Sequence, residues 1–373
     1  MLHFSKLKYL YKFLLIFFLS NIINAQNYYL YVASESDDTV SLLKFDGKHI
    51  EEKKRISVGI YPTEIEGPHG ITIDPNGKYW YLTLAHGNPY GKLIKYSTQT
   101  NEVIDETTLG LFPASMQISK VTGFLYCVNF NLHGNMKPST VSVVDAETMT
   151  EITQIKTGSM PHGSRISNDG LKQYSVAMMS GELFEIDALS LNISRKLNLD
   201  NHSKMDHSNM DHSNMDHDKI NNSKMVHSKV KPTWVIPHPK ENLLYIAGNG
   251  SDEIIEVDID KWKISKRIKA EKGPYNVEIS PDGKYMLATL KSIGYTAIWN
   301  LKNGSLINKI KNSTSVPHGI AISTDSKFAF VSVEGIGGEP GIVDVIDLNK
   351  KTLIDKVKIG KQAGGIAFWK KEL

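Results

Sequence analysis

The chain has 373 residues, and its 43 basic and 40 acidic side chains are mixed along the sequence to give a net charge of +3. This even balance gives no reason to expect binding to nucleic acid or to a membrane surface. The lone cysteine, Cys127, excludes an intramolecular disulfide, a paired-cysteine zinc motif and a CxxCH haem attachment, and its apolar neighbours predict a buried strand thiol.

Residues 1–25 have the pattern of an export signal. Three lysines (Lys6, Lys8 and Lys12) precede an apolar stretch from 13 to 19, and Ile-Asn-Ala at 23–25 fits a cleavage site. The apolar stretch is too short to span a bilayer, and no later run of about 18 apolar residues exists. We therefore expect a mature chain that begins near Gln26, has no membrane span and is periplasmic or secreted.

From residue 67 onward one unit recurs with a period of roughly 45 residues. Each copy has Pro-His-Gly or a related opening, a short alternating apolar strand, a turn and further strands that close on Val-Asp or Ile-Asp. Six complete copies open at Pro68, Pro113, Pro161, Pro232, Pro274 and Pro317. Short strands repeated in this way predict the blades of a β-propeller.

A seventh copy is divided between the two ends of the repeat array. Residues 28–59 have the middle and outer strands without an opening strand, and residues 362–370 (QAGGIAFWK) have an opening strand alone. Pairing the N-terminal strands with the C-terminal strand closes the ring and leaves no exposed inner edge. The sequence thus predicts one all-β domain over 26–373, a seven-bladed β-propeller.

One segment, at about 200–229, interrupts the repeats. It reads NHSKMDHSNMDHSNMDHDKINNSKMVHSK from residue 201, and its five-residue Met-Asp-His period fits neither a helix nor a strand. We expect a disordered surface insertion. Thioether and imidazole groups together are ligands that suit Cu(I), and the intervening carboxylates can serve Cu(II). The candidate ligands are His202, Met205, His207, Met210, His212, Met215, His217, Met225 and His227. Expansion of a low-complexity tract without metal binding is the alternative.

A second group of candidate ligands is predicted at the hub of the propeller. In this fold the connection into each innermost strand and the loop between the second and third strands lie on one face, around the channel mouth. These positions hold His69, His86, His133, His162, His318 and Glu334. The insertion should emerge on the same face. Together these side chains could hold copper or another transition metal with an open coordination position, although each opening histidine could instead only anchor its loop. Deeper in the channel, Arg165 and Glu278 are expected to form a structural ion pair.

With these motifs in view, the chain resembles the YVTN-type β-propeller family, whose repeats carry P-x-G-[IV]-x-[IV]-[ST]-x-[DN]-G and a later V-x-[VI]-[IV]-D. The matching stretches are 68–77, 161–170, 274–283 and 317–325, with the later strand at 141–145 and 343–347. The resemblance implies a seven-bladed periplasmic or surface protein and is not specific for an activity. The insertion resembles the Met/His-rich tracts of periplasmic copper-resistance proteins.

Three functions are compatible with this pattern. The leading hypothesis is a monomeric, periplasmic copper-binding propeller for copper tolerance, storage or delivery, which would exchange copper ions with a cuproprotein or an efflux component. An alternative is a copper- or iron-dependent oxidoreductase with its site at the hub. A third is a protein-interaction scaffold. The sequence contains no phosphate loop and no nucleophile elbow, and binding is favoured over catalysis.

Overall fold

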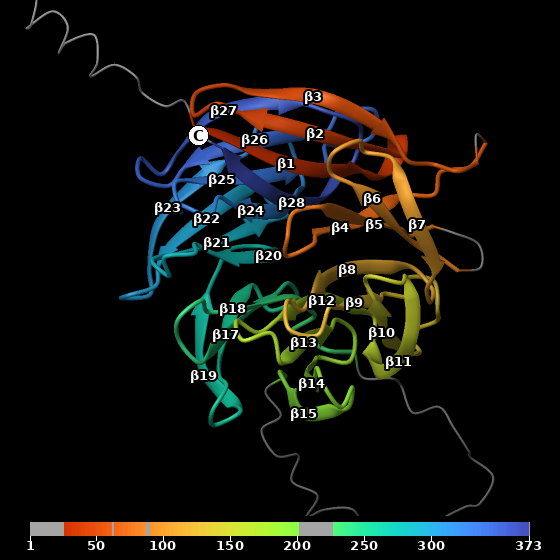
Figure 1. Cartoon of the computed structure of the whole chain (residues 1–373). Helices are drawn as coiled ribbons and strands as arrows, with labels where there is room; N and C mark the ends of the chain where they lie inside the picture. The colour runs from red at the N-terminus through yellow and green to blue at the C-terminus, as the bar shows by residue number, and fades with distance from the viewer. Residues whose placement is uncertain (1–25, 62, 87–89, 201–226, 373) are drawn as a thin grey trace, which may run out of the picture.

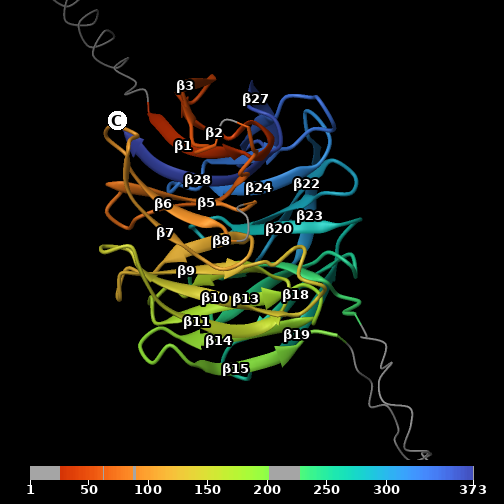
Figure 2. The ribbon, with the colours of Figure 1, turned by 90° about the vertical axis from the view of Figure 1, so that its right-hand side faces the viewer.

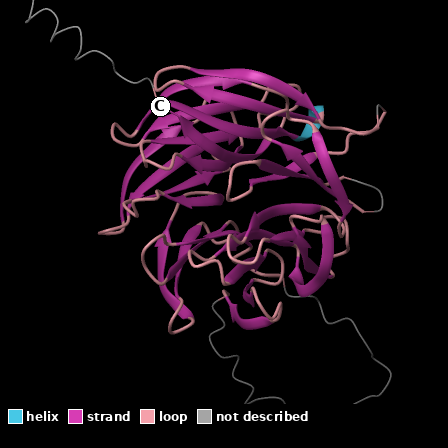
Figure 3. Cartoon of the chain, in the orientation of Figure 1, coloured by secondary structure: helices cyan, strands magenta, loops and turns pink. Residues whose placement is uncertain are grey.

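The protein is a ring of seven four-stranded antiparallel sheets in a computed structural model that describes residues 26–61, 63–86, 90–200 and 227–372 (Figures 1 and 3). Within these residues the one helical element is the short 3-10 turn η1 (Glu35–Asp37). None of the described helical segments is long and apolar enough to cross a membrane. The fold is a seven-bladed β-propeller, as the repeats predict.

The blades are numbered from the one that contains both chain ends, and their strands are given from the channel outward. Blade one comprises β28 (Ala363–Glu372), β1 (Asn27–Ser34), β2 (Thr39–Phe45) and β3 (Ile50–Ser57), and blade two comprises β4 (Pro68–Ile73), β5 (Tyr79–Leu84), β6 (Lys92–Ser97) and β7 (Val103–Thr108). Blade three comprises β8 (Pro113–Ile118), β9 (Phe124–Asn129), β10 (Pro138–Asp145) and β11 (Thr150–Ser159), and blade four comprises β12 (Pro161–Ile166), β13 (Lys172–Ala177), β14 (Glu182–Asp187) and β15 (Ile193–Asn198). Blade five comprises β16 (Pro232–Pro237), β17 (Leu243–Gly248), β18 (Glu253–Asp258) and β19 (Lys263–Lys269), and blade six comprises β20 (Pro274–Ile279), β21 (Tyr285–Leu290), β22 (Tyr295–Asn300) and β23 (Ser305–Lys311). Blade seven comprises β24 (Pro317–Ile322), β25 (Phe328–Val333), β26 (Ile342–Asp347) and β27 (Thr352–Lys358).

The ring closes through blade one. Strand β1 pairs with β28 in antiparallel register, with Leu30 opposite Phe368 and Tyr31 opposite Ala367, and both views show the two strands side by side (Figures 1 and 2). The Trp369 indole nitrogen donates to Gly77 O at 2.9 Å, which ties this blade to blade two. The predicted closure is confirmed, and it completes blade one as a four-stranded sheet.

Burial decreases from the channel outward within each blade. The inner and middle strands are largely buried, whereas nearly all of outer strand β7 is exposed. Aromatic side chains fill the space between blades: Trp80 stacks on Tyr96 with ring centres 3.9 Å apart and on Tyr31 at 5.1 Å. Cys127 is fully buried, as its neighbours predict, and burial raises the pKa of its thiol. Because apolar contacts lie between blades, each blade depends on its neighbours for stability.

The connection between β15 and β16 carries the predicted insertion. Its two ends are fastened to each other, because Asp200 Oδ1 accepts hydrogen bonds from Lys229 N at 2.9 Å and Val230 N at 3.0 Å. Ser228 N also donates to Met179 O at 3.0 Å. The candidate ligands from His202 to Met225 lie outside the described residues, as does the predicted signal segment at 1–25. His227 is described and is exposed.

Candidate functional site: a histidine cluster at the channel mouth

The mouth of the channel is lined by the second residue of each inner strand. In order around the ring these residues are Gly364, His69, Ala114, His162, Thr233, Tyr275 and His318. The small residues of blades one and three, Gly364 and Ala114, flank His69 of blade two.

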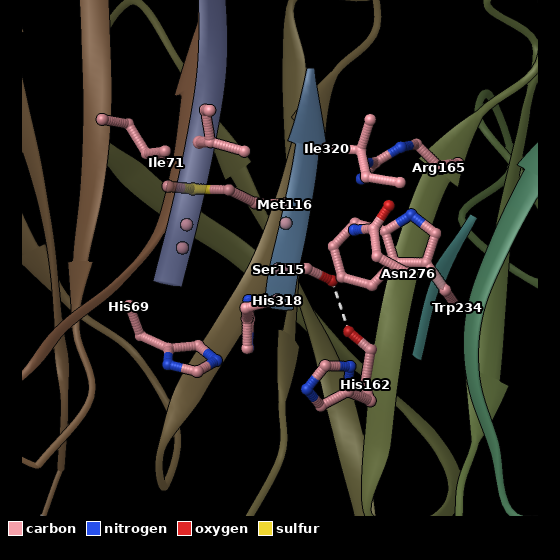
Figure 4. Close-up of a pocket in the computed structure, with 14 residues that line it drawn as sticks. His69, Ile71, Ser115, Met116, His162, Arg165, Trp234, Asn276, His318 and Ile320 are labelled. Atoms are coloured by element: carbon pink, nitrogen blue, oxygen red, sulfur yellow. Dashed lines mark hydrogen bonds between the residues drawn. The ribbon is translucent and has the colours of Figure 1, made fainter. Parts of the chain in front are cut away.

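Three of these residues, His69, His162 and His318, gather at one end of the channel (Figure 4). The His69 ring centre lies 5.8 Å from that of His318 and 6.2 Å from that of His162, and both pairs are close to perpendicular. Phe112 packs edge-on against His69, and Phe130 does the same against His162, with ring centres 5.6 and 5.1 Å apart. The aromatic walls restrict rotation of the two imidazoles.

His162 is held at both ring nitrogens. Nδ1 donates to Thr233 O at 2.9 Å, so the proton is on Nδ1, and Nε2 accepts from the Tyr275 hydroxyl at 2.8 Å. Burial, reinforced by the neighbouring His69, lowers the pKa of His162 to about 3. The imidazole is therefore neutral at physiological pH, and its Nε2 lone pair is shared with the phenol.

His318 has a free nitrogen. Only 5% of the residue is exposed, and its Nδ1 has no hydrogen-bond partner among the described residues. Nε2 lies 3.8 Å from Glu334 Oε1, which is too long for a hydrogen bond. Burial, together with the nearby Lys291 cation, lowers the pKa of His318 well below its ordinary value. A buried, neutral, unpaired imidazole nitrogen is costly unless something binds it.

His69 and His86 share one carboxylate. Glu35 Oε2 accepts from His69 Nδ1 at 3.1 Å, and Oε1 lies 2.7 Å from His86 Nε2. Burial of Glu35 favours its neutral form, but the two histidines outweigh burial and hold the pKa of the carboxyl well below its usual range. The bond to Glu35 raises the pKa of His86. Since Nδ1 of His69 carries a proton for Glu35, Nε2 is left to accept or to ligate, and Figure 4 shows it on the side facing the other two histidines.

On the blade-seven side of the mouth lies a second charged pair. Lys291 Nζ donates to Glu334 Oε1 at 2.8 Å and lies 4.2 Å from the centre of the Tyr275 ring. Burial raises the pKa of the Tyr275 hydroxyl. Glu334 is therefore committed to a lysine and lies near His318 without bonding to it.

The three histidines line one part of a cavity of about 40 Å³ in the channel, room for a few water molecules. Arg165 and Glu278 close its far end with an ion pair of 2.7 Å, and the guanidinium also lies 4.5 Å from the Trp234 ring centre. The predicted pair is confirmed. Ile71 and Met116 of the inner strands also line the cavity, because an inner strand presents its edge to the channel.

The structure separates one predicted residue from the rest. His133 is exposed in the connection after β9, and no described hydrogen bond or ion pair joins it to the other histidines. Sequence reasoning missed Glu35, Tyr275 and Lys291 as site residues. Glu35 and Lys291 directly follow the second strands of blades one and six, the same place as Glu334 in blade seven. Applying that equivalence to every blade would have found both.

The three histidines are not placed to bind one metal ion as they stand. Three imidazoles on one ion, each with a nitrogen about 2 Å from the metal, have ring centres roughly 5 to 5.5 Å apart. The observed separations of 5.8 and 6.2 Å are somewhat larger. Consistently, no three His, Cys, Asp or Glu side chains of the described chain stand close enough to hold a metal as they are. Small ring rotations would be needed, and for His162 also release of the Tyr275 hydroxyl.

Comparisons with known proteins identify the fold. No protein-family model matches the chain. Antigen Lp49 of Leptospira interrogans is 21% identical over 205 residues, covering 52% of this chain and 40% of that protein; the chain thus matches less than half the length of this curated relative. A chain of hydrazine synthase from Kuenenia stuttgartiensis superposes with a TM-score of 0.63 at 19% identity, covering 84% of this chain and 92% of the other. A functionally unknown protein from Desulfotomaculum acetoxidans gives 0.68 at 13% identity, covering 91% and 98%.

At these identities the two structures show the fold alone. The chain is a seven-bladed β-propeller whose channel mouth carries a cluster of three histidines, of which the buried His162 and His318 have lowered pKa values.

Proposed function

We propose that this protein is an exported, metal-binding β-propeller of the YVTN type, and that it binds copper for tolerance, storage or delivery. The observation that carries the proposal is the unpaired Nδ1 of buried His318, whose ring centre lies 5.8 Å from that of His69. His69 and His318 are the primary ligands, and His162 joins them when it releases Tyr275.

The chemistry of the cluster supports a transition metal over an organic ligand. Neutral imidazole is a good ligand for copper and zinc, and burial keeps His162 and His318 neutral at physiological pH. The cavity of about 40 Å³ suits an ion with a few waters and is too small for a sizeable substrate. The carboxylate behind His69 is the kind of partner that metal-bound histidines commonly have.

Copper, among the possible metals, is favoured by the sequence of the insertion. Its repeated Met-Asp-His triplets offer soft sulfur beside imidazole, the combination that suits Cu(I). The insertion leaves and re-enters the ring between blades four and five, at the face on which β12 begins with His162. In this proposal the insertion captures copper and the hub receives it, and an exported cuproprotein or an efflux component takes it onward.

The test is copper bound per chain in matched variants, measured by elemental analysis after copper loading and removal of loose ions. Deleting residues 201–226 keeps the anchored ends at Asp200 and Ser228, and this shortened protein should retain about one copper per chain. Adding H69A and H318A should remove it. The control is H49A in the shortened protein, because His49 is an exposed histidine of blade one away from the hub. A shortened protein that retains no copper would overturn a hub site.

A further inference from the structure

The third residue of each inner strand lies one position beyond the ring of mouth residues. In four blades this residue is glycine, and blade three has Ser115, whose hydroxyl already donates to His162 O. The remaining two are Trp234 on β16 and Asn276 on β20, in the neighbouring blades five and six. Figure 4 shows both side chains between the histidines and Arg165. At this level, therefore, two adjacent blades supply the large polar side chains of the channel.

Both side chains have a buried polar atom with no partner among the described residues. These atoms are Trp234 Nε1 and Asn276 Oδ1, and the two residues are only 8% and 2% exposed. The main chain of Asn276 is fixed, because its N–H group donates to Thr289 Oγ1 at 3.0 Å. A buried polar group that is held in place and unpaired lowers stability unless something binds it.

Unpaired polar atoms are concentrated at the channel cavity. Eleven buried side-chain atoms of the described residues lack a partner, and three of them, in Trp234, Asn276 and His318, belong to residues that line this cavity. If His318 binds a metal, an indole donor and an amide acceptor still remain. The cavity of about 40 Å³ has the space of about three water molecules, enough for one very small organic molecule.

The charges around the cavity favour a neutral ligand. Apart from the histidines, Arg165 is the one described residue with a charged side chain that lines it, and Glu278 already pairs with this arginine at 2.7 Å. A charged ligand would thus be buried without a counterion of its own, which is costly.

We propose that the cavity beside Trp234 and Asn276 binds a small neutral carboxamide or urea of three or four non-hydrogen atoms. Such a molecule carries a carbonyl acceptor next to an N–H donor. The carbonyl accepts from Trp234 Nε1, and the N–H group donates to Asn276 Oδ1. This site goes beyond the proposed function, because it needs no metal and none of the mouth histidines.

The experiment follows the Trp234 indole N–H group by NMR in the mature protein, labelled with ¹⁵N-tryptophan and freed of metal by a chelator. The chain has five tryptophans, and the cross-peak that is lost in W234F identifies Trp234. Acetamide is the probe. Acetone is the matched control, because it keeps the size and the carbonyl of acetamide but has no N–H donor. We expect acetamide to shift the Trp234 cross-peak saturably, with a dissociation constant of about 1 mM, and acetone to bind at least about tenfold more weakly.

Two other indoles serve as internal controls. Trp80 Nε1 and Trp262 Nε1 are also buried without a described partner, but neither residue lines this cavity, so acetamide should leave their cross-peaks in place. N276L removes the acceptor while the main-chain bond to Thr289 can persist, and it should weaken acetamide binding at least about tenfold. The matched control is N308L, because Asn308 is exposed on the outer strand of the same blade.

The outcomes separate a ligand site from a cavity that holds only water. An unshifted Trp234 cross-peak would mean water alone and would overturn the proposal. Equal responses to acetamide and acetone, or equal shifts at Trp234 and Trp80, would overturn it too, because both indicate a general solvent effect. Should N276L fail to fold, the contrast between acetamide and acetone in the wild type still decides. Since no metal is present, none of these results depends on whether the hub binds copper.

Discussion

The two ends of the central channel use charged and polar residues in opposite ways. At the far end Arg165 and Glu278 satisfy each other at 2.7 Å, and Trp234 covers the guanidinium. At the mouth His318 Nδ1 is buried with no partner among the described residues, and a carboxylate turns His69 toward it. The far end contains a closed ion pair, whereas the mouth contains an imidazole nitrogen without a partner among the described residues.

This difference shows how a symmetric scaffold acquires a site. Blades four and six contribute to both ends of the channel, through His162 and Arg165 on β12 and through Tyr275 and Glu278 on β20. The same strands thus supply an ion pair at one end and the hydrogen-bonded His162 and Tyr275 at the other, while the unpaired nitrogen of His318 comes from β24 of blade seven.

Removing a histidine at the mouth should have the largest effect on copper affinity. H318A should lower the hub copper affinity at least about a hundredfold, because it deletes the unpaired nitrogen on which the site depends. The double variant R165L/E278L changes only the far end and should leave the affinity within about twofold. Competition with a chelator of known affinity measures both, on the protein without residues 201–226. Equal losses in the two variants would mean that the cluster is not the site.

Removing the Glu35 carboxylate should have the next largest effect on copper affinity. E35A should lower hub copper affinity roughly 10- to 100-fold, since His69 loses the partner that fixes its proton on Nδ1. E35D should recover part of the loss, and the copper EPR parameters should shift in E35A, which a merely structural role would not cause.

The matched control for Glu35 is E64A, because Glu64 is an exposed carboxylate on the same face with no described side-chain partner. If E64A and E35A weaken copper binding equally, the effect is one of net charge, and the positioning role of Glu35 is wrong.

Removing one partner of the Arg165–Glu278 ion pair should lower the free energy of unfolding and leave copper binding unchanged. R165A leaves Glu278 mostly buried without its partner, and we expect the free energy of unfolding to fall by about 2–4 kcal/mol. Denaturant unfolding followed by circular dichroism measures the change. R165L/E278L should recover much of it, because an apolar pair leaves no unpaired charge. A double variant as unstable as R165A would show that packing, not charge, is what the arginine provides.

The smallest effect is expected at a carboxylate away from the hub. Asp344 Oδ2 accepts from Asn312 and from Ser313 N, but Oδ1 has no described partner. Burial raises the pKa of Asp344 despite these bonds. The folded state therefore keeps this proton to a higher pH than the unfolded state, and stability falls as pH rises from the ordinary aspartate pKa, about 3.9, through the raised folded one.

D344N removes that ionisation. Its thermal unfolding midpoint relative to wild type should therefore be higher at pH 7 than at pH 4, with copper binding unchanged. A difference that is the same at both pH values would contradict the raised pKa. This variant also tests whether an unpaired polar atom outside the hub is only a folding cost.

The fold and the opening histidines could be predicted because both follow from local repetition. A proline, an alternating strand and a turn mark each blade in the sequence. The histidine follows the proline directly, so its position in the blade is known once the motif is recognised. Glu35 was missed because blade one is divided and lacks the opening motif that marks its equivalents. The Tyr275 bond to His162 joins blades six and four across the channel, so no local pattern could reveal it.

The insertion presents the reverse situation. Its triplets are prominent in the sequence but lie outside the described residues, and their role as ligands stays a prediction. The hub cluster is inconspicuous in the sequence, since each histidine is isolated. The fold nevertheless places the ring centres of His162 and His318 6.2 and 5.8 Å from that of His69.

The most direct test of a hub metal site is a crystal structure of the protein without residues 201–226, loaded with copper and measured on both sides of the copper absorption edge. We predict an anomalous peak between His69 and His318, within bonding distance of His69 Nε2 and His318 Nδ1. Copper found only at surface histidines such as His133, or nowhere, would contradict it.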